Sequence, residues 1–281
     1  MGDKTKIDWC DASWNPVTGC LHGCEYCYAR GIANRFGLPY APKLGDPGME
    51  GAAKWDSSEG MDTMLELEKP YVKDGRKQPY PMGFLPTFHK YRLDEPQRWT
   101  KPRTIFVCSM ADLFGEWVPD EWIKEVFDAC RRAPQHRYLF LTKNPARYGE
   151  LAAEGKLPKE KNHWYGITAT DHQMAEANFR HIPNGWDGYN IFLSAEPLHG
   201  EINIPALNSW PKWVIFGAQT GNCKDKVVPK KEWIENAVAQ CRLMGVPVFM
   251  KESLRQLMGA DFVQEYPWQA YRNRKEAKRD A

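Results

Sequence analysis

Short, almost continuous apolar runs recur along the last two thirds of the chain. Strands buried on both faces of a parallel sheet have this pattern, whereas half-buried strands alternate apolar and polar positions. The pattern therefore predicts six parallel strands, and a further strand is expected between Trp14 and Thr18. The six runs are residues 104–109, 138–143, 164–168, 190–194, 212–217 and 246–251.

Two of the intervals between these runs have the apolar spacing of amphipathic helices. Residues 119–132 place Trp122 and Val126 on one helical face, and residues 230–244 are followed by Gly245, a common helix terminator. Strands that alternate with helices favour a parallel sheet with right-handed crossovers. We therefore expect an α/β fold of the partial (β/α)6-type TIM barrel class.

Residues 38–100 interrupt this alternation, because they are rich in proline, glycine and charged side chains. We expect an insertion here, between the first helix and the second strand, that forms a lid or a substrate-facing element. Residues 1–270 are predicted to form one domain that includes the insertion. The basic residues 271–281 are predicted to be a solvated C-terminal tail.

Charge and hydropathy limit the partners and the cellular compartment that we expect for the protein. The formal net charge is +2, so a basic surface for nucleic acid would have to be local. No apolar run reaches the roughly 18 residues of a membrane span, and the first residues lack the apolar core of a signal peptide. We expect a cytoplasmic protein with no membrane contact, in a compartment that keeps thiols reduced.

Three of the eight cysteines lie close together, at Cys20, Cys24 and Cys27, in a C-x3-C-x2-C pattern. Thiolates are the usual protein ligands of iron–sulfur clusters. Three thiolates leave one iron of a [4Fe–4S] cluster open, as a catalytic metal site keeps one position open. The motif therefore predicts a cluster-binding loop.

Zinc is the main alternative for the same cysteines. Zinc ribbons and fingers combine two close cysteine pairs, and this chain has no second pair. His22 would have to complete the tetrahedral site, although we interpret it as a residue that fills the loop. Structural cysteines without any metal are the remaining interpretation.

The three-cysteine motif, with Tyr26 directly before its last cysteine, resembles the signature of the radical S-adenosylmethionine (SAM) superfamily. The resemblance implies that SAM binds the open iron and is cleaved reductively to a 5′-deoxyadenosyl radical. It also implies a single-electron donor such as flavodoxin or ferredoxin.

Motifs along most of the chain resemble a bacteriophage and bacterial three-Cys-motif radical SAM family of uncharacterised function. The spacing of the first two cysteines is shorter here than in many members of that family, and Gln219 stands where the family often has glutamate. The matching stretches are residues 7–9, 11–20, 101–103, 109–114, 141–143 and 194–198.

Polar residues follow the predicted strands, where barrel enzymes place their working groups. A more distant resemblance, to the spore photoproduct lyases, implies that Ser109, Lys143 and Thr168 contact SAM. Ordinary strand-end caps are the alternative for each of them. The remaining predicted cofactor contacts are Tyr26 near adenine, Ser194, and Glu196 at the ribose or a substrate group.

Cys223 follows Gln219 at the same predicted end of the barrel. A thiol can return a hydrogen atom to a substrate radical, so Cys223 is a candidate hydrogen donor. A structural role is the alternative for this isolated cysteine.

Three functions remain open from the sequence. The first is a radical SAM enzyme that repairs or modifies a nucleic acid or nucleotide, in which the basic residues of 98–103 and 224–231 contact phosphates. The second is a radical SAM enzyme that acts on a peptide, protein or small metabolite. The third is a non-enzymatic binding protein stabilised by zinc.

Overall fold

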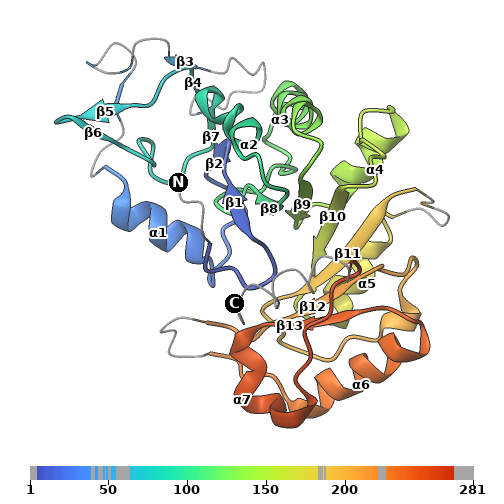
Figure 1. Ribbon diagram of the computed structural model, residues 1–281. Coiled ribbons are helices and arrows are strands. Elements are labelled where there is room, and N and C mark those ends of the chain that lie inside the picture. Colours follow the sequence, from blue (N-terminus) through green and yellow to red (C-terminus); the bar gives the residue numbers. More distant parts are fainter. Residues whose placement is uncertain are drawn as a thin grey trace. The chain divides into compact units, whose positions relative to one another are not determined.

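The computed structural model divides the chain into two compact units, Met1–Thr142 and Lys143–Ala281 (Figure 1). Each unit contains its own parallel strands and its own helices. The structure describes residues 5–38, 42–43, 47, 49, 52–54, 64–182, 186, 188–220 and 226–268.

Three parallel strands run through the first unit, β1 (Ala12–Trp14), β8 (Thr104–Val107) and β9 (Arg137–Thr142). β8 pairs with β1 on one side and β9 on the other. Every residue of β8 is buried, which explains its continuous apolar sequence. α3 (Asp120–Arg132) connects β8 to β9, with two acidic residues in its first turn and two arginines in its last, as the helix dipole favours.

A second sheet in the first unit has the order β2-β7-β4-β3. Its strands are β2 (Val17–Thr18), β7 (Thr87–His89), β4 (Leu65–Leu67) and β3 (Ala52–Lys54). The Phe88 ring of β7 is buried 5.1 Å from the Trp122 ring of α3. The predicted insertion therefore contributes a strand to the core of this unit.

Short elements complete the first unit. The helix α1 (Tyr28–Phe36) follows the three-cysteine loop. β5 (Val72–Lys73) and β6 (Arg76–Lys77) form a hairpin. The 3-10 turn η1 (Lys90–Arg92) and the helix α2 (Glu95–Arg98) lead from β7 towards β8.

Four parallel strands form the sheet of the second unit, in the order β10-β11-β12-β13. They are β10 (His163–Thr168), β11 (Asn190–Ala195), β12 (Val214–Phe216) and β13 (Val248–Met250). Its helices are α4 (Ala146–Ala153), α5 (His172–Phe179), α6 (Lys231–Leu243) and α7 (Arg255–Met258), with 3-10 turns η2 (Ile204–Ala206), η3 (Glu252–Leu254) and η4 (Gly259–Asp261).

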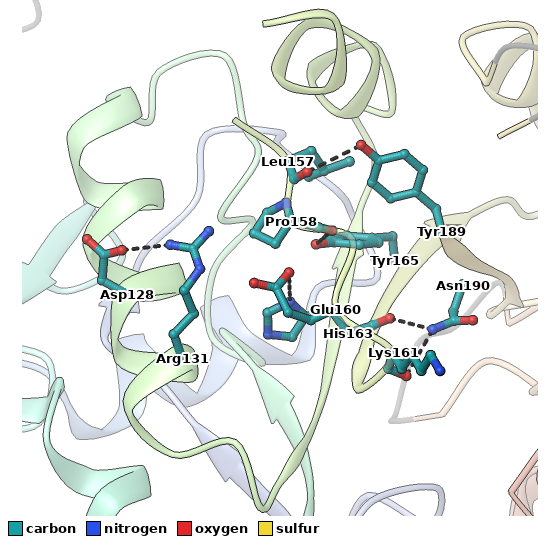
Figure 2. A network of polar contacts seen from close by, with 10 residues as sticks. All are labelled: Asp128, Arg131, Leu157, Pro158, Glu160, Lys161, His163, Tyr165, Tyr189 and Asn190. Carbon is teal, nitrogen blue, oxygen red and sulfur yellow. Dashed lines mark hydrogen bonds and ion pairs between the residues drawn. The ribbon is translucent and has the colours of Figure 1, made fainter. Parts of the chain in front are cut away.

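Polar contacts hold the segment that enters β10 (Figure 2). The Tyr165 hydroxyl donates to the Pro158 carbonyl at 2.7 Å, and the Tyr189 hydroxyl donates to the Leu157 carbonyl at 3.2 Å. The Asn190 amide donates to the His163 carbonyl at 3.0 Å. These side chains satisfy backbone carbonyls near the amino ends of β10 and β11. They therefore hold the segment that enters β10 against the sheet.

The α/β class predicted from the sequence is confirmed, and each of the six apolar runs contains a parallel strand. The strand expected between Trp14 and Thr18 is instead two strands, β1 and β2, in different sheets. The chain turns at Asn15 and Pro16, which separates them. Within the described residues, no helix is long and apolar enough to cross a membrane.

Candidate metal and cofactor site

The three-cysteine loop begins at the carboxyl end of β8. The Gly19 amide donates to the Met110 carbonyl at 2.9 Å, and Gly19 forms a parallel bridge with Ala111. Gly19 has a φ of +88°, and a Cβ added there would lie 2.1 Å from the Leu85 carbonyl oxygen. Only glycine fits this position, because both the φ angle and the close backbone approach exclude a side chain.

Backbone bonds shape the loop around its cysteines. The Cys20 amide donates to the Phe84 carbonyl at 3.2 Å, and the Cys27 amide donates to the Cys24 carbonyl at 3.3 Å. Cys27 is also the N-cap of α1, where its Sγ accepts a bond of 3.4 Å from the Arg30 amide. The Cys27 side chain therefore lies at the amino end of α1 and caps its first turn.

All three cysteines of the loop are half-buried, and none of the seven described cysteines forms a disulfide. Among the residues that the structure describes, no three His, Cys, Asp or Glu side chains meet closely enough to hold one metal ion. A cluster differs from a single ion because each thiolate binds its own iron. The set of three reduced, accessible thiols on one anchored loop fits the chemistry of a cluster with one open iron.

His22 has a defined contact that sequence reasoning did not predict. Its Nε2 lies 2.7 Å from Asp112 Oδ2, and its ring meets the edge of Trp117 at 4.8 Å between centroids. Asp112 also accepts bonds from the Thr142 hydroxyl at 3.1 Å and the Phe114 amide at 3.0 Å. The nearly buried Asp112 thus links the cysteine loop to the ends of β8 and β9. The signal in the sequence was Asp112 itself, a charged residue shortly after an apolar run.

Ser109 lies where the sequence predicts, just after β8. Its hydroxyl donates to Asn15 Oδ1 at 3.1 Å, and the same oxygen accepts from the Met110 amide at 2.9 Å. The Ser109 carbonyl accepts the Tyr28 hydroxyl at 2.8 Å. The Ser109 hydroxyl therefore donates its proton to Asn15, and its oxygen can still accept a hydrogen bond from a ligand. Tyr26 lies half-buried in the loop.

Cys108 directly follows β8 next to this site, yet its environment differs from that of the loop cysteines. It has a φ of +57° and is buried. Burial raises the pKa of the Cys108 thiol to about 12. A thiol that stays protonated is a poor metal ligand, so Cys108 does not extend the three-cysteine set.

In the second unit, Thr168 is the last residue of β10 and Ser194 the last but one of the neighbouring β11, and the two are register partners. Each side chain is about 99% buried, and neither hydroxyl has a hydrogen-bond partner. Buried polar groups are normally paired, so two adjacent exceptions at a carboxyl strand end mark a place for a ligand or water. Lys143 lies half-buried directly after β9.

Glu196 follows β11 and is paired with Lys251, which follows β13. Gly217, after β12, lies directly beside this pair, since a Cβ added there would come within 3.0 Å of both side chains. The predicted Glu196 contact with a cofactor must therefore compete with a lysine. The Gln219 side chain accepts from the Val227 amide at 3.3 Å. Cys223 lies outside the described residues.

The basic stretch 98–103 does not lie at the carboxyl ends of the strands. It precedes β8 and is therefore at the opposite end of that strand from the cysteine loop. The Arg103 guanidinium stacks 5.0 Å over the Trp99 ring, which also meets His136 edge-on. In the other predicted stretch, Lys230 lies 5.4 Å over Trp233, and Lys231 is paired with Asp261 and Glu235.

Two solved structures resemble this chain in fold. Spore photoproduct lyase complexed with a dinucleoside spore photoproduct has a TM-score of 0.50 at 11% identity, covering 89% of this chain and 79% of that one. A cysteine-to-serine mutant of spore photoproduct lyase has a TM-score of 0.49 at 12% identity, with the same coverage. At this level of identity the likeness concerns the fold.

A search of the curated proteins found no match. One family model, described as a protein of unknown function (DUF5131), matches residues 4–270. The match spans both units and includes the three-cysteine loop, Asp112 and the Thr168–Ser194 pair. The chain therefore belongs to the DUF5131 family.

Proposed function

We propose that this protein is a radical SAM enzyme whose Cys20, Cys24 and Cys27 hold a [4Fe–4S] cluster. The observation that carries the proposal is the loop itself. Three reduced, half-buried thiols lie on one loop, and Gly19 attaches that loop to the carboxyl end of a parallel strand. The fold likeness to spore photoproduct lyase supports the same conclusion.

The residues around the loop would hold its shape. When bound, the cluster supplies the electron that cleaves SAM to methionine and a 5′-deoxyadenosyl radical. Asp112 holds His22 and thereby the stretch between Cys20 and Cys24, and Trp117 packs against the same ring. The Arg30 amide at the start of α1 donates to Cys27 Sγ and so fixes the position of that side chain.

Thr168 and Ser194 are the residues of the second unit that best fit a hydroxyl-rich ligand. Their hydroxyls are buried, adjacent and without partners, and a ribose diol offers both donors and acceptors. Their contact with SAM stays a prediction from the sequence. The contacts of Tyr26, Ser109, Lys143 and Glu196 with SAM, and hydrogen donation by Cys223, stay predictions from the sequence.

Anaerobic reconstitution with iron and sulfide tests the proposal. The wild type is expected to bind about four irons with sulfide, as a [4Fe–4S] cluster requires, and to form 5′-deoxyadenosine from SAM with dithionite. Cys24→Ala should lose both. Cys10→Ala is the matched control, because Cys10 is a buried cysteine before β1 and outside the loop; it should keep both.

Metal analysis also separates the alternatives. One zinc per chain, without sulfide, would identify a zinc-stabilised binding protein and end the radical SAM proposal. Iron and sulfide without 5′-deoxyadenosine would leave a cluster protein that does not cleave SAM.

For the substrate class we propose a nucleic acid or nucleotide, with a peptide, protein or small metabolite as the alternative. The support is the dinucleoside photoproduct in the similar solved structure and the lysines between β12 and α6. Oligonucleotide binding should weaken as salt rises, with Lys226→Glu and Lys230→Glu reducing the slope. No binding at low salt would favour the alternative.

A further inference from the structure

An exposed apolar stripe runs along the outer side of α1. Eight large hydrophobic side chains are exposed among the described residues, and four of them lie between residues 21 and 36. Tyr28, Ile32 and Phe36 are 54%, 36% and 55% exposed, and their spacing of four places them in one line along the helix. Leu21, in the cysteine loop, is 42% exposed. We call these four residues the α1 stripe.

The face of α1 next to the stripe packs against the rest of the unit. Ala29 and Ala33 are buried against Tyr80 and Met110, and small side chains let the helix pack closely there. The apolar residues on the outer side therefore contribute nothing to this packing. A line of exposed apolar side chains beside charged residues is typical of an interaction surface.

The stripe is continuous in sequence with the proposed cluster ligands. Leu21 follows Cys20 directly and Tyr28 follows Cys27, so each is one residue from a thiol. The Tyr28 ring is held in place by its bond to the Ser109 carbonyl. A protein that covers the stripe therefore lies beside the cysteine loop.

The charge on α1 indicates the kind of partner. The helix carries Arg30 and Arg35 and no acidic residue, so α1 itself is basic. Aromatic residues and arginine are enriched in interface cores, and electron-transfer encounters use small interfaces. The Arg35 guanidinium lies 5.4 Å over the Phe36 ring, so apolar and basic groups are combined at one point.

We infer that the α1 stripe, with the adjacent Arg35, is the docking surface for an acidic one-electron carrier protein that reduces the cluster. This inference rests on the proposed function and names the partner of that site. An acidic carrier approaches a basic helix with electrostatic steering, and the exposed rings provide the apolar contact once it arrives.

Reduced flavodoxin and dithionite, used as alternative reductants of the reconstituted protein, test the inference. Ile32→Glu, Phe36→Glu and Arg35→Glu should each lower the flavodoxin-supported rate of 5′-deoxyadenosine formation by about tenfold or more, because they place like charge in the contact. Their dithionite-supported rates should stay within about twofold of wild type, since dithionite needs no docking surface. Leu243→Glu is the matched control, an exposed apolar residue on α6 that should change neither rate.

Binding gives a second readout that does not depend on activity. Oxidised flavodoxin should bind the wild type with an affinity that falls as salt rises, and Arg35→Glu should weaken that binding. Unchanged flavodoxin rates and binding in the three variants would overturn the inference, as expected if the stripe is covered by another part of this chain or a second copy. An equal loss with both reductants would also overturn it. If the wild type makes no 5′-deoxyadenosine even with dithionite, the proposed function fails instead.

Discussion

At the residue scale, the cysteine loop depends on two glycines in different situations. Gly19 and Gly23 both have positive φ angles, +88° and +71°. A Cβ at Gly19 would clash with the Leu85 backbone, whereas a Cβ at Gly23 would have nothing within 4 Å. Substitution at Gly23 therefore tests backbone strain alone, whereas substitution at Gly19 tests backbone strain together with a steric clash.

We expect Gly23→Ala to cost about 1–2 kcal/mol of unfolding free energy, from the left-handed backbone alone. Gly19→Ala should cost about 3 kcal/mol or more, because a clash with backbone is added. It should also reduce iron incorporation by displacing the start of the loop. Urea denaturation and iron analysis measure both effects, and equal costs for the two variants would contradict the structure.

The cysteines should also differ in reactivity. Burial raises the pKa of Cys108 and of Cys241 to about 12 in each case, so both remain protonated thiols at pH 8. The half-buried Cys20, Cys24 and Cys27 can be reached by reagent. In the metal-free protein, iodoacetamide at pH 8 should alkylate the loop and leave Cys108 and Cys241 unmodified until the chain unfolds. Peptide mass spectrometry reads this directly, and early labelling of Cys108 would argue against its burial.

At the element scale, the sheet that contains β2 and β7 should sense pH through a buried histidine. His89 lies 2.8 Å from the Thr18 hydroxyl and 3.2 Å from the Tyr91 hydroxyl. Burial, together with the Arg92 guanidinium, holds the pKa of His89 well below its ordinary value of 6.5. The unfolded chain therefore binds a proton at this residue at pH values where the folded chain does not.

The free energy of unfolding should consequently fall as the pH drops below about 6.5. One buried histidine such as His89 contributes a slope of about 1.4 kcal/mol per pH unit. His89→Gln should remove that part of the slope between pH 6.5 and 5, although it also costs stability at neutral pH. Burial lowers the pKa of His136 too, so a smaller slope should remain. Denaturation at several pH values checks this, with His181→Gln, at an exposed position of the second unit, as the control. An unchanged slope in His89→Gln would mean that His89 is protonated in the fold.

At the scale of the whole molecule, the chain returns at its C-terminal end to complete the second unit. Trp213 is fully buried, and the rings of Tyr266 and Trp268 lie 5.8 and 5.2 Å from its ring. The Trp213 indole donates to the Glu265 carbonyl at 2.9 Å. Residues far apart in sequence thus share one aromatic cluster.

Truncation after Asp261 should therefore unfold the second unit or leave it aggregated, because removing even one such large ring from a core costs about 3–5 kcal/mol. Truncation after Ala270 removes none of the described contacts and should leave the melting temperature unchanged. Circular dichroism and tryptophan fluorescence distinguish the two. A stable, cooperative protein ending at Asp261 would show that the aromatic cluster is dispensable.

The sequence was sufficient to predict the α/β class, the six parallel strands and the helices α3 and α6. These features depend on local apolar periodicity, which is written along the chain. It also located the three-cysteine loop, because spacing within eight residues is visible without a fold.

Tertiary structure alone decided the contacts between distant residues. The His22–Asp112 pair joins positions 90 residues apart, and the two unpartnered hydroxyls of Thr168 and Ser194 are neighbours only because of strand register. The part of the predicted insertion that contains Phe88 belongs to the core of the first unit for the same reason. A linear sequence records which groups are present, but long-range pairing depends on the free energy of the whole fold. That is why the loop could be located from the sequence, while the residues that hold it in place could not.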